Sequence, residues 1–271
     1  MNLKMVLFDL DGTLLPMDMD VFIKCYFGSL ITKLSESGYD QKLLNDAMKY
    51  GLGAMMKNRG EKTNEDVFWE TFATVYGKSK EECTSDFEQF YEKDFDGVSK
   101  SCGFTPEARV CIKKLMDMGL PVALATNPLF PKIATYKRVK WAGLEPSWFR
   151  LITTYENSRT SKPNPAYYVE VAEALGVAPD RCLMVGNDVS DDMVAQSLGM
   201  KVFLLDSCLI NSKGEDISRY PHGGFAELME YIKTLVDRLR SYTVFSPYKQ
   251  EGYQIREPLV LRAASLQKEG T

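Results

Sequence analysis

The chain has 271 residues, of which 45% are apolar and 26% are charged, a composition that is typical of a folded protein with a hydrophobic core. This length suggests one or two domains. A net charge of −4 argues against a dedicated nucleic-acid-binding protein, because such a protein needs an excess of basic residues to contact phosphates. No apolar run reaches the roughly 18 residues that span a bilayer, and residues 1–11 lack the layout of a signal peptide.

Cysteine and histidine usage narrows the possible chemistry. The six cysteines include no C-x-x-C pair, which in a chain of this length indicates reduced thiols, and we therefore expect a cytoplasmic protein. His222 is the only histidine, so zinc sites built from several histidines cannot form. The sequence also lacks a G-x-S-x-G elbow and a phosphate-binding P-loop. Acid–base chemistry is therefore expected to depend on carboxylates and lysine.

Short, continuous apolar runs predict strands that are buried on both faces. These runs are Met5–Phe8, Val122–Ala125, Leu151–Ile152, Leu183–Val185 and Val202–Leu205. Apolar residues at helical spacing predict helices within 108–116, 168–175 and 225–239, and His222 is expected in a loop before the last of them. Strands that alternate with helices favour an α/β fold with a doubly wound parallel sheet.

A long segment without strand patterns follows the first predicted strand. Residues 17–97 show helical spacing instead, as in Phe68, Phe72 and Val75. We interpret residues 16–100 as an inserted α-helical cap domain, and residues 1–15 plus 101–240 as the α/β core. A separate N-terminal helical domain is the alternative, but it would leave the first strand without a sheet to join. Residues 241–271 form a C-terminal extension whose role the sequence leaves open.

Polar side chains follow several predicted strands where ligands bind in open parallel sheets, at the carboxyl ends. These segments are Asp9-Leu10-Asp11-Gly12-Thr13, Thr126-Asn127, Ser161-Lys162-Pro163 and Gly186-Asn187-Asp188-Val189-Ser190-Asp191-Asp192. Taken singly, each has an alternative explanation as a turn or a helix cap. Asp9 and Asp11, however, point roughly the same way, and their repulsion favours a cation between them. With Asp188 they form a set of hard oxygen ligands suited to Mg²⁺.

These motifs, in this order, resemble the haloacid dehalogenase-like hydrolase superfamily. The resemblance covers residues 4–15 and 100–225, and it depends on the Asp9–Thr13 motif, Thr126, Lys162 and the acidic segment 188–192. The helical insertion resembles the cap of the phosphatase branch, which lies between the first and second motifs. In the common form of the last motif an aspartate follows the glycine directly, whereas here Asn187 intervenes.

The resemblance implies a role for each acidic residue. Asp9 is the expected nucleophile, which forms an aspartyl-phosphate, and Asp11 is the expected general acid and then base. The implied Mg²⁺ ligands are Asp9, the main-chain carbonyl of Asp11, and Asp188. Asp192 and Asp191 are supporting residues, and each remains an alternative to Asp188 as the direct ligand.

The resemblance also implies which groups bind the phosphate. Lys162 supplies a balancing positive charge, with a solvated surface lysine as its alternative interpretation. Thr126 and the amide of Asn127 donate hydrogen bonds to phosphate oxygens. The backbone amides of Leu10 and Asp11 point at the same group.

The expected function is that of a Mg²⁺-dependent phosphomonoester hydrolase acting on a small soluble phosphorylated metabolite. Asp11 favours a phosphatase over a dehalogenase, since an alkoxide leaving group needs a proton and a halide does not. The alternatives are a phosphomutase of the same superfamily and a catalytically idle protein that binds a partner. We expect no nucleic-acid or membrane partner, and the oligomeric state stays open.

Overall fold

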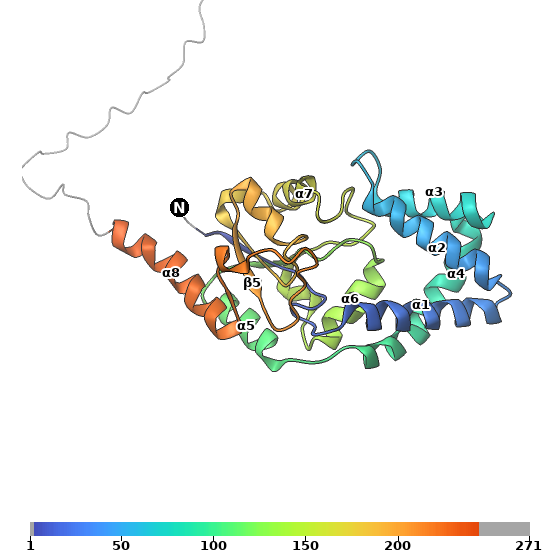
Figure 1. Cartoon of the computed structure of the whole chain (residues 1–271), viewed down its shortest axis with the longest axis horizontal. Coiled ribbons are helices and arrows are strands. Elements are labelled where there is room, and N and C mark those ends of the chain that lie inside the picture. The colour runs from blue at the N-terminus through green and yellow to red at the C-terminus, as the bar shows by residue number, and fades with distance from the viewer. Residues whose placement is uncertain (1–2, 244–271) are drawn as a thin grey trace, which may run out of the picture.

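A computed structural model of the chain describes the backbone of residues 3–243 and the side chains of residues 3–236 (Figure 1). Its centre is a sheet with the strand order β3-β2-β1-β4-β5-β6, in which every neighbouring pair is parallel. The strands are β1 (Met5–Phe8), β2 (Val122–Leu124), β3 (Phe149–Ile152), β4 (Cys182–Gly186), β5 (Lys201–Leu205) and β6 (His222–Gly223). This order confirms the predicted doubly wound α/β fold.

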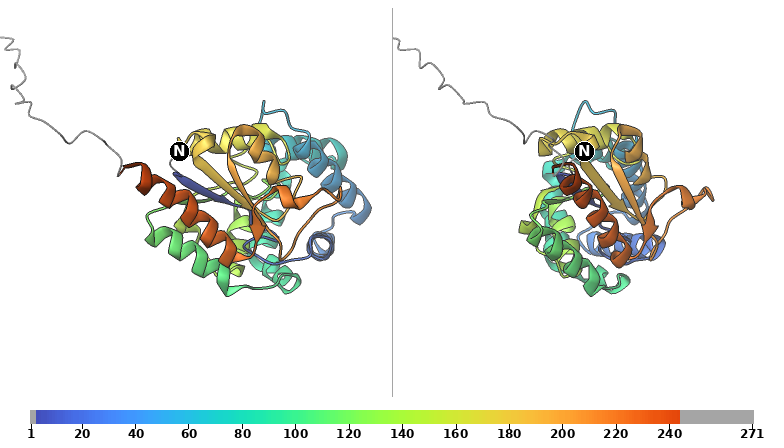
Figure 2. Two further views of the ribbon diagram at one scale, coloured as in Figure 1. Left: turned by 60° about the vertical axis from the view of Figure 1, so that its left-hand side comes forward. Right: turned by 90° about the vertical axis from the view of Figure 1, so that its left-hand side faces the viewer.

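Helices cover both faces of the sheet. They are α5 (Pro106–Asp117), α6 (Lys132–Trp141), α7 (Pro165–Leu175) and α8 (Phe225–Thr243), with short 3₁₀ helices η3 (Pro146–Trp148), η4 (Pro179–Arg181), η5 (Met193–Leu198) and η6 (Ile217–Arg219). Helices α5 and α8 lie side by side on one face (Figure 2). Alternate residues of β1 face opposite layers: Val6 and Phe8 pack in the cluster that includes α5 and α8, whereas Leu7 packs with α7. This burial on both faces explains the continuous apolar run.

The regular elements between β1 and α5 are helices joined by short connections. It contains α1 (Met19–Glu36), α2 (Gln41–Met56), α3 (Asn64–Tyr76), α4 (Lys80–Gln89), a π-helical turn η1 (Phe90–Asp94) and a 3₁₀ helix η2 (Phe95–Ser101). Helix α3 starts at a capping box between Thr63 and Asp66 and ends at Gly77 in the left-handed conformation. Together with Phe130 and Ala134 of the sheet-containing part, these helices form a second hydrophobic cluster. They gather at one end of the molecule (Figure 1).

The two connections between these helices and the sheet run side by side. The Gly103 amide donates to the Pro16 carbonyl at 2.7 Å, and Met17 forms an antiparallel bridge with Cys102. The chain therefore leaves and re-enters the sheet-containing part at the same place. The predicted domain limits, 1–15 plus 101–240 and 16–100, stay a prediction.

Two elements differ from the sequence-based expectation. Helix α6 was not predicted, because its buried residues include Arg138 and Thr135, and these interrupt an apolar stripe. His222 was expected in a loop, yet it lies in β6 and pairs with Leu204 of β5. A strand of two residues is too short to show periodicity. Most of the predicted extension 241–271 lies outside the described residues.

Among the helices within residues 3–243, none has the length and apolarity needed to cross a membrane.

The aromatic cluster of the helical insertion yields a test of stability. Phe72 is fully buried and its ring packs against Phe68, Trp69 and Phe87. We expect Phe72→Ala to lower the free energy of unfolding by about 3–5 kcal/mol, measured by urea denaturation, because a cavity replaces the ring. Tyr50→Ala, at an exposed position, serves as the control and is expected to change it by less than about 0.5 kcal/mol. Equal effects of the two variants would contradict this packing.

Candidate active site

A buried lysine joins two carboxylates at the carboxyl edge of the sheet. Lys162 precedes α7, and its Nζ donates to Asp9 Oδ1 at 2.8 Å and to Asp192 Oδ1 at 2.7 Å. Its side chain is 1% exposed. Burial favours the neutral amine, but the Asp192 and Asp9 carboxylates outweigh it and raise the pKa of Lys162 well above its ordinary value. Lys162 is therefore a charged group of the site and not a solvated surface lysine.

Asp9 lies directly after β1, where its amide donates to the Val185 carbonyl of β4. Burial raises the pKa of Asp9 to about 7; Lys162 opposes this shift, and the charges of Asp192 and Asp11 add to it. The Thr13 hydroxyl lies 3.1 Å from Asp9 Oδ2 and 2.8 Å from Asn187 Oδ1, and it bridges the two segments. The β1 loop is thus tied to the β4 loop through side chains.

A glycine allows the β1 loop to turn beneath Asn187. Gly12 has φ +82°, and a Cβ atom there would lie 2.4 Å from Asn187 Nδ2. The carbonyl of Leu10 accepts from the amides of Thr13, Leu14 and Leu15, which fixes the turn. The Asp-x-Asp-Gly-Thr motif therefore combines two carboxylates with the one residue type that permits this close approach.

The loop after β4 holds its three aspartates in different ways. Asp188 Oδ1 accepts from the amides of Ser190 and Asp191 at 2.7 and 2.9 Å. Asp192 Oδ2 accepts from the Asp188 amide at 3.0 Å, so both Asp192 oxygens are engaged. Burial raises the pKa of Asp188 above its ordinary value and that of Asp191 to about 6. A Cβ atom at Gly186 would lie 2.0 Å from Asp192 Oδ2, which explains the glycine there.

Asp11 has a partner that the sequence did not indicate. The guanidinium of Arg138, a fully buried residue of α6, donates to Asp11 Oδ2. Asp11 Oδ1 is buried and has no hydrogen-bond partner among the described residues. One carboxylate oxygen is therefore held while the other is unengaged. No motif pointed to Arg138, because a single arginine inside an unpredicted helix carries no sequence signal.

Thr126 and Asn127 follow β2 as expected. The Thr126 carbonyl accepts from the hydroxyls of Tyr167 at 2.8 Å and Thr153 at 2.7 Å, which anchors the loop. Asn127 Nδ2 lies 3.4 Å from Asp191 Oδ2, at the long end of the hydrogen-bond range, and Asn127 Oδ1 is buried without a partner among the described residues. The loops after β2 and β4 thus meet at the same edge.

A second buried tyrosine supports the site and was also missed. The Tyr168 hydroxyl donates to the Asp191 carbonyl at 2.7 Å, and both Tyr167 and Tyr168 are fully buried. In the sequence, Tyr168 was interpreted only as part of an apolar helix face. Burial raises the pKa of Tyr168 well above its ordinary value, so it stays a neutral donor.

The side-chain oxygen atoms at this edge are suitable ligands for a hard divalent cation. Lys162 pairs with Asp9 and Asp192, and Arg138 pairs with Asp11. Asp188 and Asp191 lie in the same loop as Asp192, so the segment offers further carboxylate oxygens, which are hard ligands. Within the described part of the chain, no three Asp, Glu, His or Cys side chains gather closely enough to form a metal site by themselves. A Mg²⁺ ion commonly uses one or two carboxylates and takes its other ligands from phosphate and water, so two carboxylates and a carbonyl fit it.

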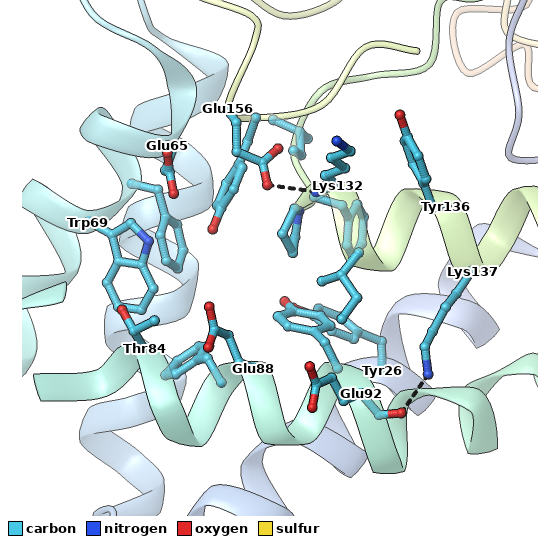
Figure 3. Close-up of a pocket in the computed structure, with 18 of the residues that line it drawn as sticks. Tyr26, Glu65, Trp69, Thr84, Glu88, Glu92, Lys132, Tyr136, Lys137 and Glu156 are labelled. Atoms are coloured by element: carbon cyan, nitrogen blue, oxygen red, sulfur yellow. Dashed lines mark hydrogen bonds between the residues drawn. The ribbon is translucent and has the colours of Figure 1, made fainter. Parts of the chain in front are cut away.

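A separate cavity of about 740 Å³ lies between the helical insertion and α6. Figure 3 shows Glu88 and Trp69 directed toward its centre and Lys132 on the opposite side. None of the predicted site residues lines this cavity. It is therefore distinct from the carboxylate site. Tyr26 lines the cavity and also belongs to the hydrophobic cluster of the helices.

Comparison with known proteins places this chain in a family. The profile of the haloacid dehalogenase-like hydrolase family matches residues 3–199. A phosphoglycolate phosphatase of Aquifex aeolicus is 26% identical over 202 residues, which cover 74% of this chain and 84% of that protein.

Solved structures show the same fold. A 2-haloacid dehalogenase from Pseudomonas syringae has a TM-score of 0.59 at 20% identity, with 86% of this chain and 99% of that chain covered. A predicted phosphoglycolate phosphatase from Haemophilus somnus has a TM-score of 0.52 at 18% identity, with 85% and 98% covered. At these identities the similarity concerns the fold alone.

The lysine–carboxylate cluster predicts a difference between buried and exposed ion pairs. Asp192→Ala would leave Lys162 with one carboxylate and the Asp188 amide without its acceptor. We expect it to lower the free energy of unfolding by about 1–3 kcal/mol in urea denaturation, because the buried Lys162 ammonium keeps only Asp9 and the Asp188 amide loses its acceptor.

Glu230→Ala is the matched control, since it removes an exposed ion pair with a similar separation, in which Lys233 Nζ lies 2.6 Å from Glu230 Oε1. Its effect should stay below about 0.5 kcal/mol. If Asp192→Ala were no more destabilising than this control, the buried cluster would not be a structural centre.

Proposed function

The chain belongs to the haloacid dehalogenase-like hydrolase family and is a phosphatase of it, and on this premise we propose that it hydrolyses small soluble phosphate monoesters with Mg²⁺, through an aspartyl-phosphate. The observation that carries the proposal is the arrangement around Asp9: its carboxylate is paired with buried Lys162, and the partly engaged carboxylate of Asp11 lies two residues away. A nucleophile, a balancing cation and a proton donor are the three groups that the reaction requires.

Asp11 supports a phosphatase over a dehalogenase. Cleavage of a phosphate ester releases an alkoxide, which needs a proton, whereas a halide leaves without one. A carboxyl group near the nucleophile supplies that proton, and Asp11 lies two residues after Asp9 in the same loop.

We infer two chemical steps. An Asp9 carboxylate oxygen attacks phosphorus, the bond from phosphorus to the ester oxygen breaks, and Asp11 donates its proton to the departing oxygen. Asp11, now a carboxylate, takes a proton from a water molecule, whose oxygen attacks the aspartyl-phosphate, releases phosphate and restores Asp9. Each step leaves Asp11 in the protonation state that the next step needs.

The phosphate group would be held by residues from three loops. Lys162 offers positive charge on one side, and the Thr126 hydroxyl and the Asn127 amide offer hydrogen bonds from the end of β2. The backbone amides of Leu10 and Asp11 complete this set. Because Lys162 is already fixed by Asp9 and Asp192, little reorganisation is needed when the phosphate binds.

Mg²⁺ would be held by the Asp9 carboxylate, the Asp11 main-chain carbonyl and Asp188. When bound, it offsets the negative charge of the nucleophile and of the phosphate. We propose Asp188 rather than Asp192 as the direct ligand, because Asp188 accepts the Ser190 and Asp191 amides through Oδ1 alone, whereas Asp192 ties Lys162 to the Asp188 amide through both of its oxygens. Asp191 and Asp192 act as supporting residues.

Substrate choice would depend on the helical insertion, which we propose to act as a cap formed by residues 16–100 over a core of residues 1–15 and 101–240. A cap over the carboxyl edge admits small phosphate esters more readily than a phosphoprotein. The phosphoglycolate phosphatase relatives make phosphoglycolate the first member of a substrate panel. We further propose a cytoplasmic location, which the six free thiols support.

The nucleophile assignment predicts a hierarchy of variants. Asp9→Asn should reduce phosphate release from an aryl phosphate by on the order of 10⁴-fold or more, because the nucleophile is lost. Asp11→Asn should reduce it by roughly 10²–10⁴-fold, because general acid–base catalysis is lost. Phosphate release is followed colorimetrically.

Asp117→Asn is the control, since this aspartate is exposed at the end of α5 and belongs to none of the motifs; its activity should equal that of the unaltered protein. Full activity in Asp9→Asn would overturn the mechanism. An unaltered protein without activity on the whole panel would favour the binding-protein alternative, and transfer of phosphate to a second sugar hydroxyl would favour the phosphomutase.

The cation assignment predicts a metal requirement. EDTA should abolish phosphate release and Mg²⁺ should restore it, because the repelling aspartates need a divalent cation. Asp188→Ala should raise the Mg²⁺ concentration for half-maximal activity at least about 10-fold, since one direct ligand is lost. Phosphate release that persists in EDTA would be incompatible with the assignment.

A further inference from the structure

We propose that Arg138 is a positioning residue for the proton-transfer step: it holds Oδ2 of Asp11 and leaves Oδ1 to exchange the proton with the leaving group. The inference rests on the proposed function, because it assigns a task to the general acid of that reaction. Among the described residues, the Arg138 guanidinium hydrogen-bonds to Asp11 and Thr135 and not to the Asp9 carboxylate, so we assign it a positioning role.

The contacts of Asp11 are asymmetric. Its Oδ2 accepts from the Arg138 guanidinium, and its buried Oδ1 has no partner among the described residues. A buried polar atom without a partner is costly and needs an explanation. A carboxyl oxygen that must bind and release a proton during each reaction cycle explains it.

The guanidinium is held firmly in place. Its centre lies 4.2 Å from the ring centroid of Phe130 and 5.8 Å from that of Phe22, and a second nitrogen lies 3.3 Å from the Thr135 hydroxyl. Arg138 is fully buried. Stacking on aromatic rings restricts a planar guanidinium, so the group that holds Asp11 is itself restrained.

A purely structural explanation of this pair is weaker. A buried ion pair contributes little to stability compared with apolar side chains of the same volume, because both charges lose their water. The Arg138 Nε is also buried without a partner among the described residues, so the pair is not optimised for stability. A general acid, by contrast, must be held to within a fraction of an ångström, and a supporting side chain provides this.

The aromatic rings also link Asp11 to the helical insertion. Phe22 belongs to α1, whereas Phe130 precedes α6 in the sheet-containing part. The two rings lie 6.0 Å apart and both contact Arg138. Arg138 therefore connects Asp11 both to α1 and to the segment before α6.

The test compares leaving groups. We would measure kcat/KM for a series of phosphate monoesters, from dinitrophenyl phosphate, whose leaving group needs no proton, to an alkyl phosphate, whose leaving group does. In Arg138→Gln we expect kcat/KM to fall at least about 10-fold for the alkyl ester and less than about 3-fold for the dinitrophenyl ester. Arg138→Lys keeps the charge without the planar fork and should show a smaller fall with the same selectivity.

Lys137→Gln is the matched control, because it removes an ion pair to Asp96 from the same helix on a side that does not contact Asp11. It should leave the dependence on the leaving group unchanged. In an Asp11→Asn background, Arg138→Gln should add no further selective loss. Thermal unfolding of each variant identifies those that fold, and Arg138→Lys decides the matter if Arg138→Gln does not fold.

A loss that is equal for all esters, or no loss, would overturn the inference and leave the proposed function intact. An unaltered protein that releases no phosphate would instead overturn the proposed function. The two failures are therefore distinguished by the unaltered protein alone.

Discussion

One buried cation shared between two carboxylates is the interaction on which the rest of the site depends. Lys162 loses nearly all of its water, and this cost is offset only because Asp9 and Asp192 lie within hydrogen-bond distance. Asp192 in turn fixes the loop after β4 through the Asp188 amide. The position of the nucleophile, the charge that faces the phosphate and the course of the acidic loop are therefore set together. None of them can be altered without disturbing the others.

The parallel sheet is the means by which residues far apart in sequence come to share this lysine. Strand β1 lies between β2 and β4, and the three strands are parallel, so the segments that follow them begin at the same edge of the sheet. Glycines at positions 12 and 186 remove the side chains that would keep these loops apart. The Thr13 hydroxyl then bridges Asp9 and Asn187. Asn187, which departs from the common motif of the family, is thus a structural tie between two loops.

Much of the site was predictable because its residues follow strands with strong apolar patterns. Asp9, Asp11 and Asp188 were found from their positions after such runs, and the structure brings their segments to one edge, while their roles stay proposals. Arg138 was not predictable. Helix α6 buries Arg138 and Thr135, and these polar residues interrupt the apolar periodicity by which a helix is predicted. The residues that contact Asp11 or support that contact therefore hide the helix in the sequence. Burial and pairing across 127 positions of sequence are properties of the folded chain alone.

The paired connections beside Pro16 and Gly103 have an evolutionary consequence. Because the chain enters and leaves the helical insertion at one point, that insertion can be lengthened, shortened or exchanged without altering the order of the strands. The chemistry of phosphate transfer and the selection of the molecule that carries the phosphate can then diverge at separate rates. The contact of Phe22 with Arg138 restricts this freedom, since it joins the insertion to a buried residue of α6.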